Sequence, residues 1–253
     1  MGLEKKNIVI DCDNLNLDYH IHNATSQSFK NKLLVTALGG LISEGQHDKA
    51  VVVKALKKIN IKIYENDRVG LVGHNGSGKT TLLRVLSGIY QPTHGSINIK
   101  HNVTSLIDLN LGIDPEATGR ENIKIRSAIL GLKRKEIEDI MEPIIEFTDL
   151  GNFIDLPYRI YSAGMQLRLA FAVATTIKPN ILVMDEWLSA GDADFQEKAN
   201  KRLKSVINQS KALILASHSP DLITNNCNRV IALDHGQIVF DGNPEEFYKT
   251  PEI

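Results

Sequence analysis

The sequence predicts an α/β fold with a mainly parallel, helix-covered sheet, a small antiparallel β lobe and an inserted helical lobe. An apolar run at residues 69–72 leads through a glycine-rich turn into a helical pattern over 79–86. Apolar runs at 181–184 and 212–216 flank a helical pattern at 195–210, and this alternation is typical of a parallel sheet. Helical periodicity without strand patterns fills the middle third of the chain.

The antiparallel lobe is predicted from three stretches in which apolar and polar residues alternate: Asn7 to Tyr19, Ile59 to Tyr64 and Gly95 to Lys100. Residues 20–50 are predicted to form an insertion with one short amphipathic helix around the apolar stretch Leu33 to Leu41. We hypothesise that this stretch contacts a membrane partner, and packing on its own domain is the alternative.

The remaining elements complete a single predicted domain spanning residues 1–253. We expect the core and the antiparallel lobe to be built from 1–104 and 178–253, with the helical lobe at 105–177. A hairpin over 229–241, turning at His235-Gly236, is predicted to close the sheet. The helical lobe rests on periodic stretches at 120–130, 133–147 and 165–177.

Bulk composition excludes several classes of protein. The chain has 253 residues, with 29 Lys and Arg against 30 Asp and Glu, so no overall charge favours nucleic acid as a partner. No signal-peptide pattern and no apolar run of membrane-spanning length is present, which predicts a soluble, cytoplasmic protein. Cys12 and Cys227 lack CxxC spacing, which favours buried reduced thiols over a disulfide or a zinc site.

The glycine-rich turn, Gly73 to Thr80 (GHNGSGKT), fits the P-loop pattern. Its glycines let backbone N–H groups surround phosphates at a helix N-terminus. Lys79 is predicted to reach the outer phosphates and the Thr80 hydroxyl to bind Mg²⁺. A chance glycine-rich turn is disfavoured by the strand before it and the helix after it.

A second motif, Ile181 to Glu186, is an apolar strand that ends in two carboxylates. Asp185 is the predicted magnesium residue, acting through water, and Glu186 is predicted to activate the water that attacks the γ-phosphate. Without the P-loop, a strand followed by a solvated acidic turn would be the better interpretation. With the P-loop present, that preference reverses.

Together the two motifs give a chain that resembles the ATP-binding cassette ATPases from about Asn7 to Tyr248. The resemblance implies hydrolysis of ATP with Mg²⁺ by two copies of the chain beneath a membrane permease. It implies Glu186, His218 and Lys79 as catalytic residues. It implies an ATP-binding set of Gly73, His74, Asn75, Gly76, Ser77, Gly78, Lys79, Thr80, Thr81, Tyr19, Ser162, Gly164 and Asp192.

Four of these residues stand at counterparts of further family motifs. Tyr161 to Met165 (YSAGM) is a variant of the LSGGQ signature, so Ser162 and Gly164 are expected to contact the γ-phosphate held by the other copy. Asp192 ends the stretch SAGD, matching the loop that crosses the dimer interface, although Gly191 replaces the usual Leu. His218 follows the 212–216 strand, where the family has a histidine that contacts the γ-phosphate.

Two positions depart from the family pattern. The glutamine that senses Mg²⁺ and the permease should fall near Leu109, where none stands, so Asp108 and Asn110 are its candidate replacements in the magnesium site. The adenine-stacking aromatic residue is missing from residues 51–54. Tyr19 is therefore its candidate, although a tyrosine that ends a strand is usually a packing residue.

The subfamily is indicated by the YSAGM signature, residues 185–195, the TGREN stretch at 118–122 and the insertion after Tyr19. These resemble bacterial exporters of lipid-linked polysaccharides such as O-antigen, capsule and teichoic acid. The resemblance implies a position at the cytoplasmic face of the inner membrane, with the polysaccharide contacted indirectly. Because the chain ends soon after Tyr248, we expect no C-terminal carbohydrate-binding domain.

Three alternatives remain at this point. An ATPase of an importer or small-molecule exporter would share every catalytic residue, and only the insertion and the signature variant argue against it. A soluble ATPase of translation or DNA repair usually has two cassettes or long coiled-coil insertions. A nucleotide sensor without catalysis would lack Glu186 or His218, and both are present.

Overall fold

The computed structural model describes residues 7–21, 42–44, 51–186 and 193–249. The chain divides into two compact units. The first comprises Met1–Val103, Asn180–Trp187 and Lys211–Ile253, and the second Thr104–Pro179 and Leu188–Ser210. None of the helices in the described ranges combines the length and apolarity needed to cross a bilayer. The predicted domain boundaries stay a prediction, and the helix expected at Leu33 to Leu41 lies outside the described residues.

The first unit is centred on a mainly parallel sheet with the order β10-β9-β4-β8-β7-β6, of whose last strand only the first residue, Val103, belongs to this unit. Strand β4 pairs in parallel with β8 and β9, β7 pairs in parallel with β8, and β10 is antiparallel to β9. The predicted strands and the closing hairpin are thereby confirmed. The strands are β4 (Arg68–Val72), β6 (Val103–Ser105), β7 (Ile181–Asp185), β8 (Ala212–Ala216), β9 (Arg229–Asp234) and β10 (Gln237–Gly242).

Helices pack on this sheet, as its apolar strands require. Helix α2 (Lys79–Leu86) packs on β7 and β8 and buries Leu82, Leu83 and Val85 completely. Its bounds match the predicted helix. Helices α7 (Pro220–Asn226) and α8 (Pro244–Lys249) were not predicted, because elements of seven and six residues are too short to display a helical period.

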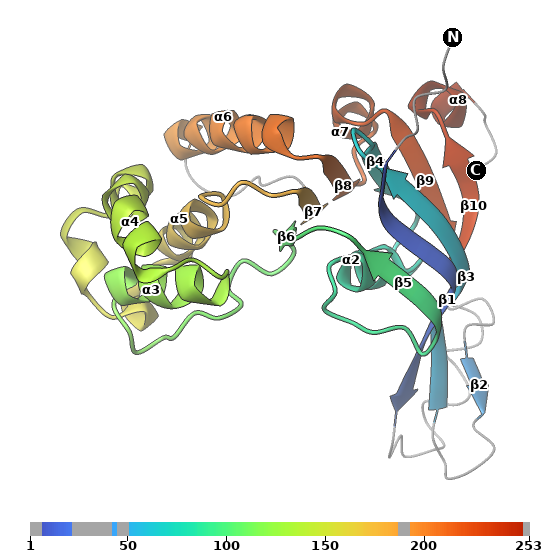
Figure 1. Ribbon diagram of the computed structural model, residues 1–253, viewed down its shortest axis with the longest axis horizontal. Coiled ribbons are helices and arrows are strands. Elements are labelled where there is room, and N and C mark those ends of the chain that lie inside the picture. The colour runs from blue at the N-terminus through green and yellow to red at the C-terminus, as the bar shows by residue number, and fades with distance from the viewer. Residues whose placement is uncertain (1–6, 22–41, 45–50, 187–192, 250–253) are drawn as a thin grey trace. The chain divides into compact units, whose positions relative to one another are not determined.

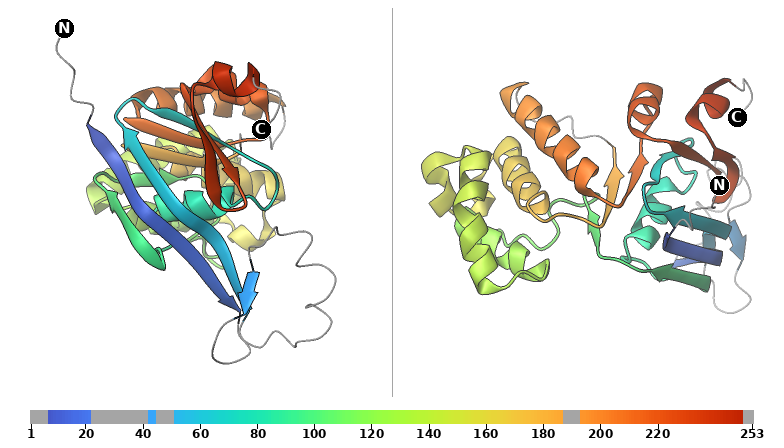
Figure 2. Two further views of the ribbon diagram at one scale, coloured as in Figure 1. Left: turned by 90° about the vertical axis from the view of Figure 1, so that its right-hand side faces the viewer. Right: turned by 45° about the horizontal axis from the view of Figure 1, so that its top comes forward.

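The first unit also contains an antiparallel sheet with the order β2-β3-β1-β5. Strands β1 (Ile8–Ile21) and β3 (Val51–Tyr64) run side by side along most of their length, as Figure 2 shows. The lobe is confirmed, but β3 begins eight residues before the predicted start at Ile59. Its register against β1 is irregular there, so alternation is lost. The other strands are β2 (Ile42–Glu44) and β5 (His94–Ile99).

The second unit is helical, as predicted for the middle of the chain (Figure 1). Phe147, Phe171 and Phe195 join three of its helices through ring contacts at 5.7–6.3 Å between centroids. The Arg202 guanidinium lies 4.3 Å from the centre of the Phe147 ring. The helices are α3 (Gly119–Ile129), α4 (Arg134–Thr148), α5 (Ala163–Ala174) and α6 (Ala193–Gln209), with short 3-10 turns η1 (Gly151–Asp155) and η2 (Tyr158–Ile160).

Candidate functional site

The P-loop joins β4 to α2 in the first unit. Gly73, Gly76 and Gly78 have φ values of 147°, 83° and 106°, which other residues rarely adopt. A Cβ atom at Gly73 would fall against the carbonyl of Leu233, whereas at Gly76 it would meet nothing within 4 Å. Position 73 therefore requires glycine because a side chain would not fit, and position 76 favours glycine because of its positive φ. The space beside Gly76 is open and can receive a ligand.

The β9–β10 turn contacts the P-loop and holds its backbone in place by a hydrogen bond. The Gly236 N–H donates a hydrogen bond of 2.9 Å to the Ser77 carbonyl. Ser77 is 1% exposed, and its hydroxyl has no hydrogen-bond partner within the described part of the chain. A buried hydroxyl without a partner is unfavourable, so the loop keeps at Ser77 a polar group whose hydrogen bond the described residues do not supply.

Lys79 lies inside the loop rather than in solvent. Its ammonium group donates to the carbonyls of Gly73 at 2.7 Å and His74 at 3.0 Å. Burial lowers the pKa of Lys79, while the charges of Asp185 and Glu186 act in the opposite direction. The carboxylates therefore favour the charged form of the amine at the place where P-loop proteins bind phosphate.

Thr80 and Asp185 form a pair of oxygen donors next to Lys79. The Thr80 hydroxyl donates to Asp185 Oδ2 at 2.7 Å, although the residues are 105 positions apart in sequence. Hydroxyl and carboxylate oxygens are the ligands that Mg²⁺ prefers. Thr80 and Asp185, two of the predicted magnesium residues, thus lie together, and their chemistry fits the ion.

Glu186 and His218 follow the ends of neighbouring strands. Asp185 pairs with Ala216 across β7 and β8, and the Glu186 N–H donates to the Ala216 carbonyl at 2.9 Å. Both side chains are exposed, and Glu186 has a left-handed φ of 68°. Since β4, β8 and β7 are adjacent and parallel, their carboxyl ends bring the P-loop, His218 and the two carboxylates to one edge of the sheet.

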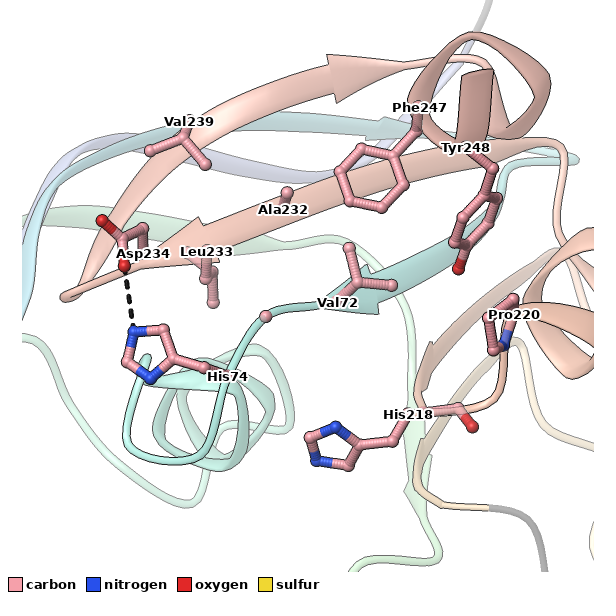
Figure 3. Close-up of a pocket in the computed structure, with 12 residues that line it drawn as sticks. Val72, His74, His218, Pro220, Ala232, Leu233, Asp234, Val239, Phe247 and Tyr248 are labelled. Atoms are coloured by element: carbon pink, nitrogen blue, oxygen red, sulfur yellow. Dashed lines mark hydrogen bonds and ion pairs between the residues drawn. The ribbon is translucent and has the colours of Figure 1, made fainter. Parts of the chain in front are cut away.

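A pocket of about 590 Å³ opens at this edge within the first unit. Figure 3 shows His74 and His218 among its lining residues, with the His74 ring turned toward Asp234. Helix α8 contributes Phe247 and Tyr248 to the wall. The pocket therefore combines P-loop residues with apolar and aromatic side chains.

Tyr19, the candidate for adenine stacking, lies beside α2. Its side chain interacts with those of Thr81 and Tyr90, and the two tyrosine rings meet edge to face with centroids 6.1 Å apart. Burial is the main cause that raises the pKa of Tyr19. The structure thus places this ring next to the P-loop helix, half-buried rather than in the core.

The signature residues lie in the second unit at the start of α5. Ser162 is the N-cap, and its hydroxyl accepts a hydrogen bond of 3.3 Å from the Met165 N–H. Ser162 is exposed and Gly164 is half-buried. The helix therefore begins with accessible backbone N–H groups and a favourable dipole for an anion.

The TGREN stretch supports the signature, a role that sequence reasoning did not assign. Thr118 and Glu121 form a capping box at the start of α3. Gly119 leaves room for the Tyr161 hydroxyl, which donates to the Phe153 carbonyl at 2.6 Å. Tyr161 directly precedes Ser162. The sequence shows a glycine immediately after a helix N-cap. That this position needs a glycine for lack of space is evident from the tertiary packing and not from the sequence.

We expect Gly119→Ala to lower the free energy of unfolding by about 1–3 kcal/mol, because its Cβ would overlap Tyr161 Oη and lie 2.9 Å from Ile154 Cδ1. Tyr161→Phe should cost about 1 kcal/mol by removing one hydrogen bond. Chemical denaturation should show that the double variant costs less than the sum of the single variants. Additivity within about 0.5 kcal/mol would contradict this packing role.

The structure gives less support for the roles predicted for Asp108, Asn110 and Asp192. Asp108 and Asn110 lie in the second unit, where Asp108 Oδ1 accepts from the Asn110 N–H at 3.3 Å. Asn110 Oδ1 accepts from the Tyr158 hydroxyl at 3.1 Å, so this amide already has a protein partner. Asp192 lies outside the described residues. The magnesium role of Asp108 or Asn110 stays a prediction.

The part of the chain that contains the P-loop and the Asp185–Glu186 pair matches a known protein family. The family model described as ABC transporter matches residues 56–189. The chain is 44% identical over 225 residues to the O-antigen export system ATP-binding protein RfbE of Yersinia enterocolitica, covering 89% of this chain and 94% of that protein. It is 39% identical to the teichoic acids export ATP-binding protein TagH of Shouchella clausii (strain KSM-K16), over 78% of this chain and 55% of TagH.

The fold has solved counterparts. A dimeric ATP-binding cassette, MJ0796 bound to ADP and Pi, superposes with a TM-score of 0.67 at 20% identity, over 93% of this chain and 98% of that one. At this identity the likeness concerns the fold alone. The family match and the relatives that align over most of the chain establish its family, and the P-loop, Asp185 and Glu186 at one edge of the sheet agree with this assignment. The chain belongs to the ABC transporter family and is an ATP-hydrolysing cassette.

Proposed function

We propose that this cassette hydrolyses ATP to drive export of a lipid-linked polysaccharide of the O-antigen, capsule or teichoic acid type. The observation that carries the proposal is the 44% identity to an O-antigen export ATP-binding protein over 94% of its length. The teichoic acid export relative supports the same substrate class. The P-loop and the two carboxylates lie at one edge of the sheet, where the Thr80 hydroxyl donates a hydrogen bond to Asp185. These groups can bind the phosphates and Mg²⁺, as such a subunit requires.

In this proposal the P-loop binds the phosphates of ATP. Backbone N–H groups from Gly73 to Thr80 surround them, and Lys79 offsets their charge from within the loop. Thr80 and Asp185 hold Mg²⁺, which when bound neutralises charge on the phosphates. Glu186 orients the attacking water and accepts its proton, and His218 contacts the γ-phosphate beside it. Tyr19 stacks on the adenine.

Two copies of the chain complete each site. Ser162 and Gly164 of one copy contact the γ-phosphate held by the P-loop of the other, where the N-terminus of α5 stabilises negative charge. Asp192 belongs to the loop between the copies, and Asp108 or Asn110 completes the magnesium site. The dimer acts on a membrane permease from the cytoplasmic face of the membrane, so the polysaccharide is handled by the permease and not by this chain.

The proposal is tested in cells whose only copy carries Glu186→Gln. We expect loss of polysaccharide from the cell surface and accumulation of the lipid-linked polymer inside, because hydrolysis no longer resets the transporter. Glu138→Gln, an exposed change on α4, is the matched control and should leave export unchanged. Normal surface polysaccharide with Glu186→Gln at normal protein level would contradict the proposal.

A further inference from the structure

Two histidines and one carboxylate gather where the β9–β10 turn meets the P-loop. His74 Nε2 lies 2.9 Å from Asp234 Oδ1, and His235 Nε2 lies 3.8 Å from the same oxygen. One donor atom from each residue lies within 4.8 Å of the other two. Donors around a tetrahedral Zn²⁺ ion are about 3.3 Å apart, given metal–ligand bonds of about 2.0–2.1 Å. Small side-chain rotations would bring all three into contact with one ion.

The hydrogen bonds of His74 suit a metal ligand. Its Nδ1 lies 2.7 Å from the Asn75 carbonyl, which can only accept, so Nδ1 carries a hydrogen. The lone pair of Nε2 in the neutral ring is then directed at the Asp234 carboxylate, as Figure 3 shows for the ring itself. Two acceptors at this distance need a proton or a cation between them. A histidine whose second nitrogen donates to a backbone carbonyl is the usual arrangement in metal sites.

The turn fixes the other two donors. His235 and Gly236 both have positive φ, 45° and 78°, between the paired residues Asp234 and Gln237, which describes a type I′ hairpin turn. Among the described residues, His235 Nδ1 is buried without a hydrogen-bond partner, so no protein acceptor orients this ring. The ring instead lies edge to face with His74, with centroids 4.9 Å apart.

We propose that His74, Asp234 and His235 form a binding site for a divalent transition-metal ion of the Zn²⁺, Co²⁺ or Ni²⁺ type. Imidazole ligands select these ions over Mg²⁺, which prefers oxygen, so the site is chemically distinct from the Thr80–Asp185 pair. The three side chains are between one third and one half exposed, which leaves further coordination positions to water. Because the His74 carbonyl accepts from Lys79, the site is built onto the nucleotide-binding loop.

The test is a Co²⁺ titration of the full chain without a histidine tag, in excess Mg²⁺, followed by visible absorption and calorimetry. We expect one Co²⁺ per chain with a ligand-field band. His235→Asn and Asp234→Asn should each weaken binding by about tenfold or more. Asparagine is chosen at His235 because it tolerates a left-handed backbone. His101→Asn, which removes a histidine 3.9 Å from the Glu65 carboxylate, is the matched control and should bind normally.

Equal Co²⁺ affinity in wild type, His235→Asn and Asp234→Asn would overturn the proposal, as would wild type that binds no Co²⁺. In that case His74 and Asp234 form only an ion pair. Thermal unfolding of each variant establishes that it is folded. If His235→Asn does not fold, Asp234→Asn decides the result, because its side chain is 49% exposed and can be changed without altering the turn.

Discussion

The Glu186→Gln variant should lose ATP turnover by about 10²- to 10⁴-fold while it still binds ATP, since a neutral amide cannot accept a proton from the attacking water. The phosphate cradle is unaffected, because Lys79 and the Thr80–Asp185 pair do not depend on this carboxylate for their hydrogen bonds. Hydrolysis no longer separates the two copies, so a dimer should persist with ATP. Size-exclusion chromatography and phosphate release measure the two effects.

Glu138→Gln is the matched control for this experiment. Its carboxylate is exposed on α4 and pairs with Arg134 one turn away, so turnover and oligomeric state should be those of wild type. If Glu186→Gln stays monomeric with ATP and hydrolyses it at the normal rate, the role proposed for Glu186 is wrong.

Lys79→Ala should weaken nucleotide binding itself, by at least about tenfold, since charge-assisted hydrogen bonds to phosphate contribute about 1.5–3 kcal/mol. Lys79 is 8% exposed and its ammonium group is held by two loop carbonyls, so the charge is fixed inside the loop. Equilibrium binding of a fluorescent ATP analogue measures the effect.

A second variant separates charge from packing at this position, and a surface variant serves as the control. Lys79→Met keeps much of the buried stem and removes the charge, so it should bind as poorly as Lys79→Ala. Lys201→Ala, an exposed change on α6 next to Glu197, should bind normally. Unchanged affinity in both Lys79 variants would show that the ammonium group does not bind phosphate.

Local sequence pattern predicted most of the secondary structure and the catalytic candidates Lys79 and Glu186. The P-loop, the apolar strands and α2 follow from short-range rules, because glycine spacing and apolar periodicity act over one element at a time. The same rules failed for α7 and α8, which are too short for a period, and for the first half of β3. The roles assigned to the site residues remain predictions, and those of Tyr19, Ser162, Asp192 and His218 rest on family resemblance.

The sequence by itself determined which chemical groups are present and on which elements they lie. Only the tertiary structure decided which of them meet. The parallel pairing of the strands brings Asp185 to Thr80, and the β9–β10 turn brings Asp234 and His235 to His74. The packing of Tyr161 against Gly119 leaves no space for a side chain at position 119. These contacts join residues that are tens to more than a hundred positions apart, and strand register and side-chain packing fix them through long-range interactions that no local pattern encodes.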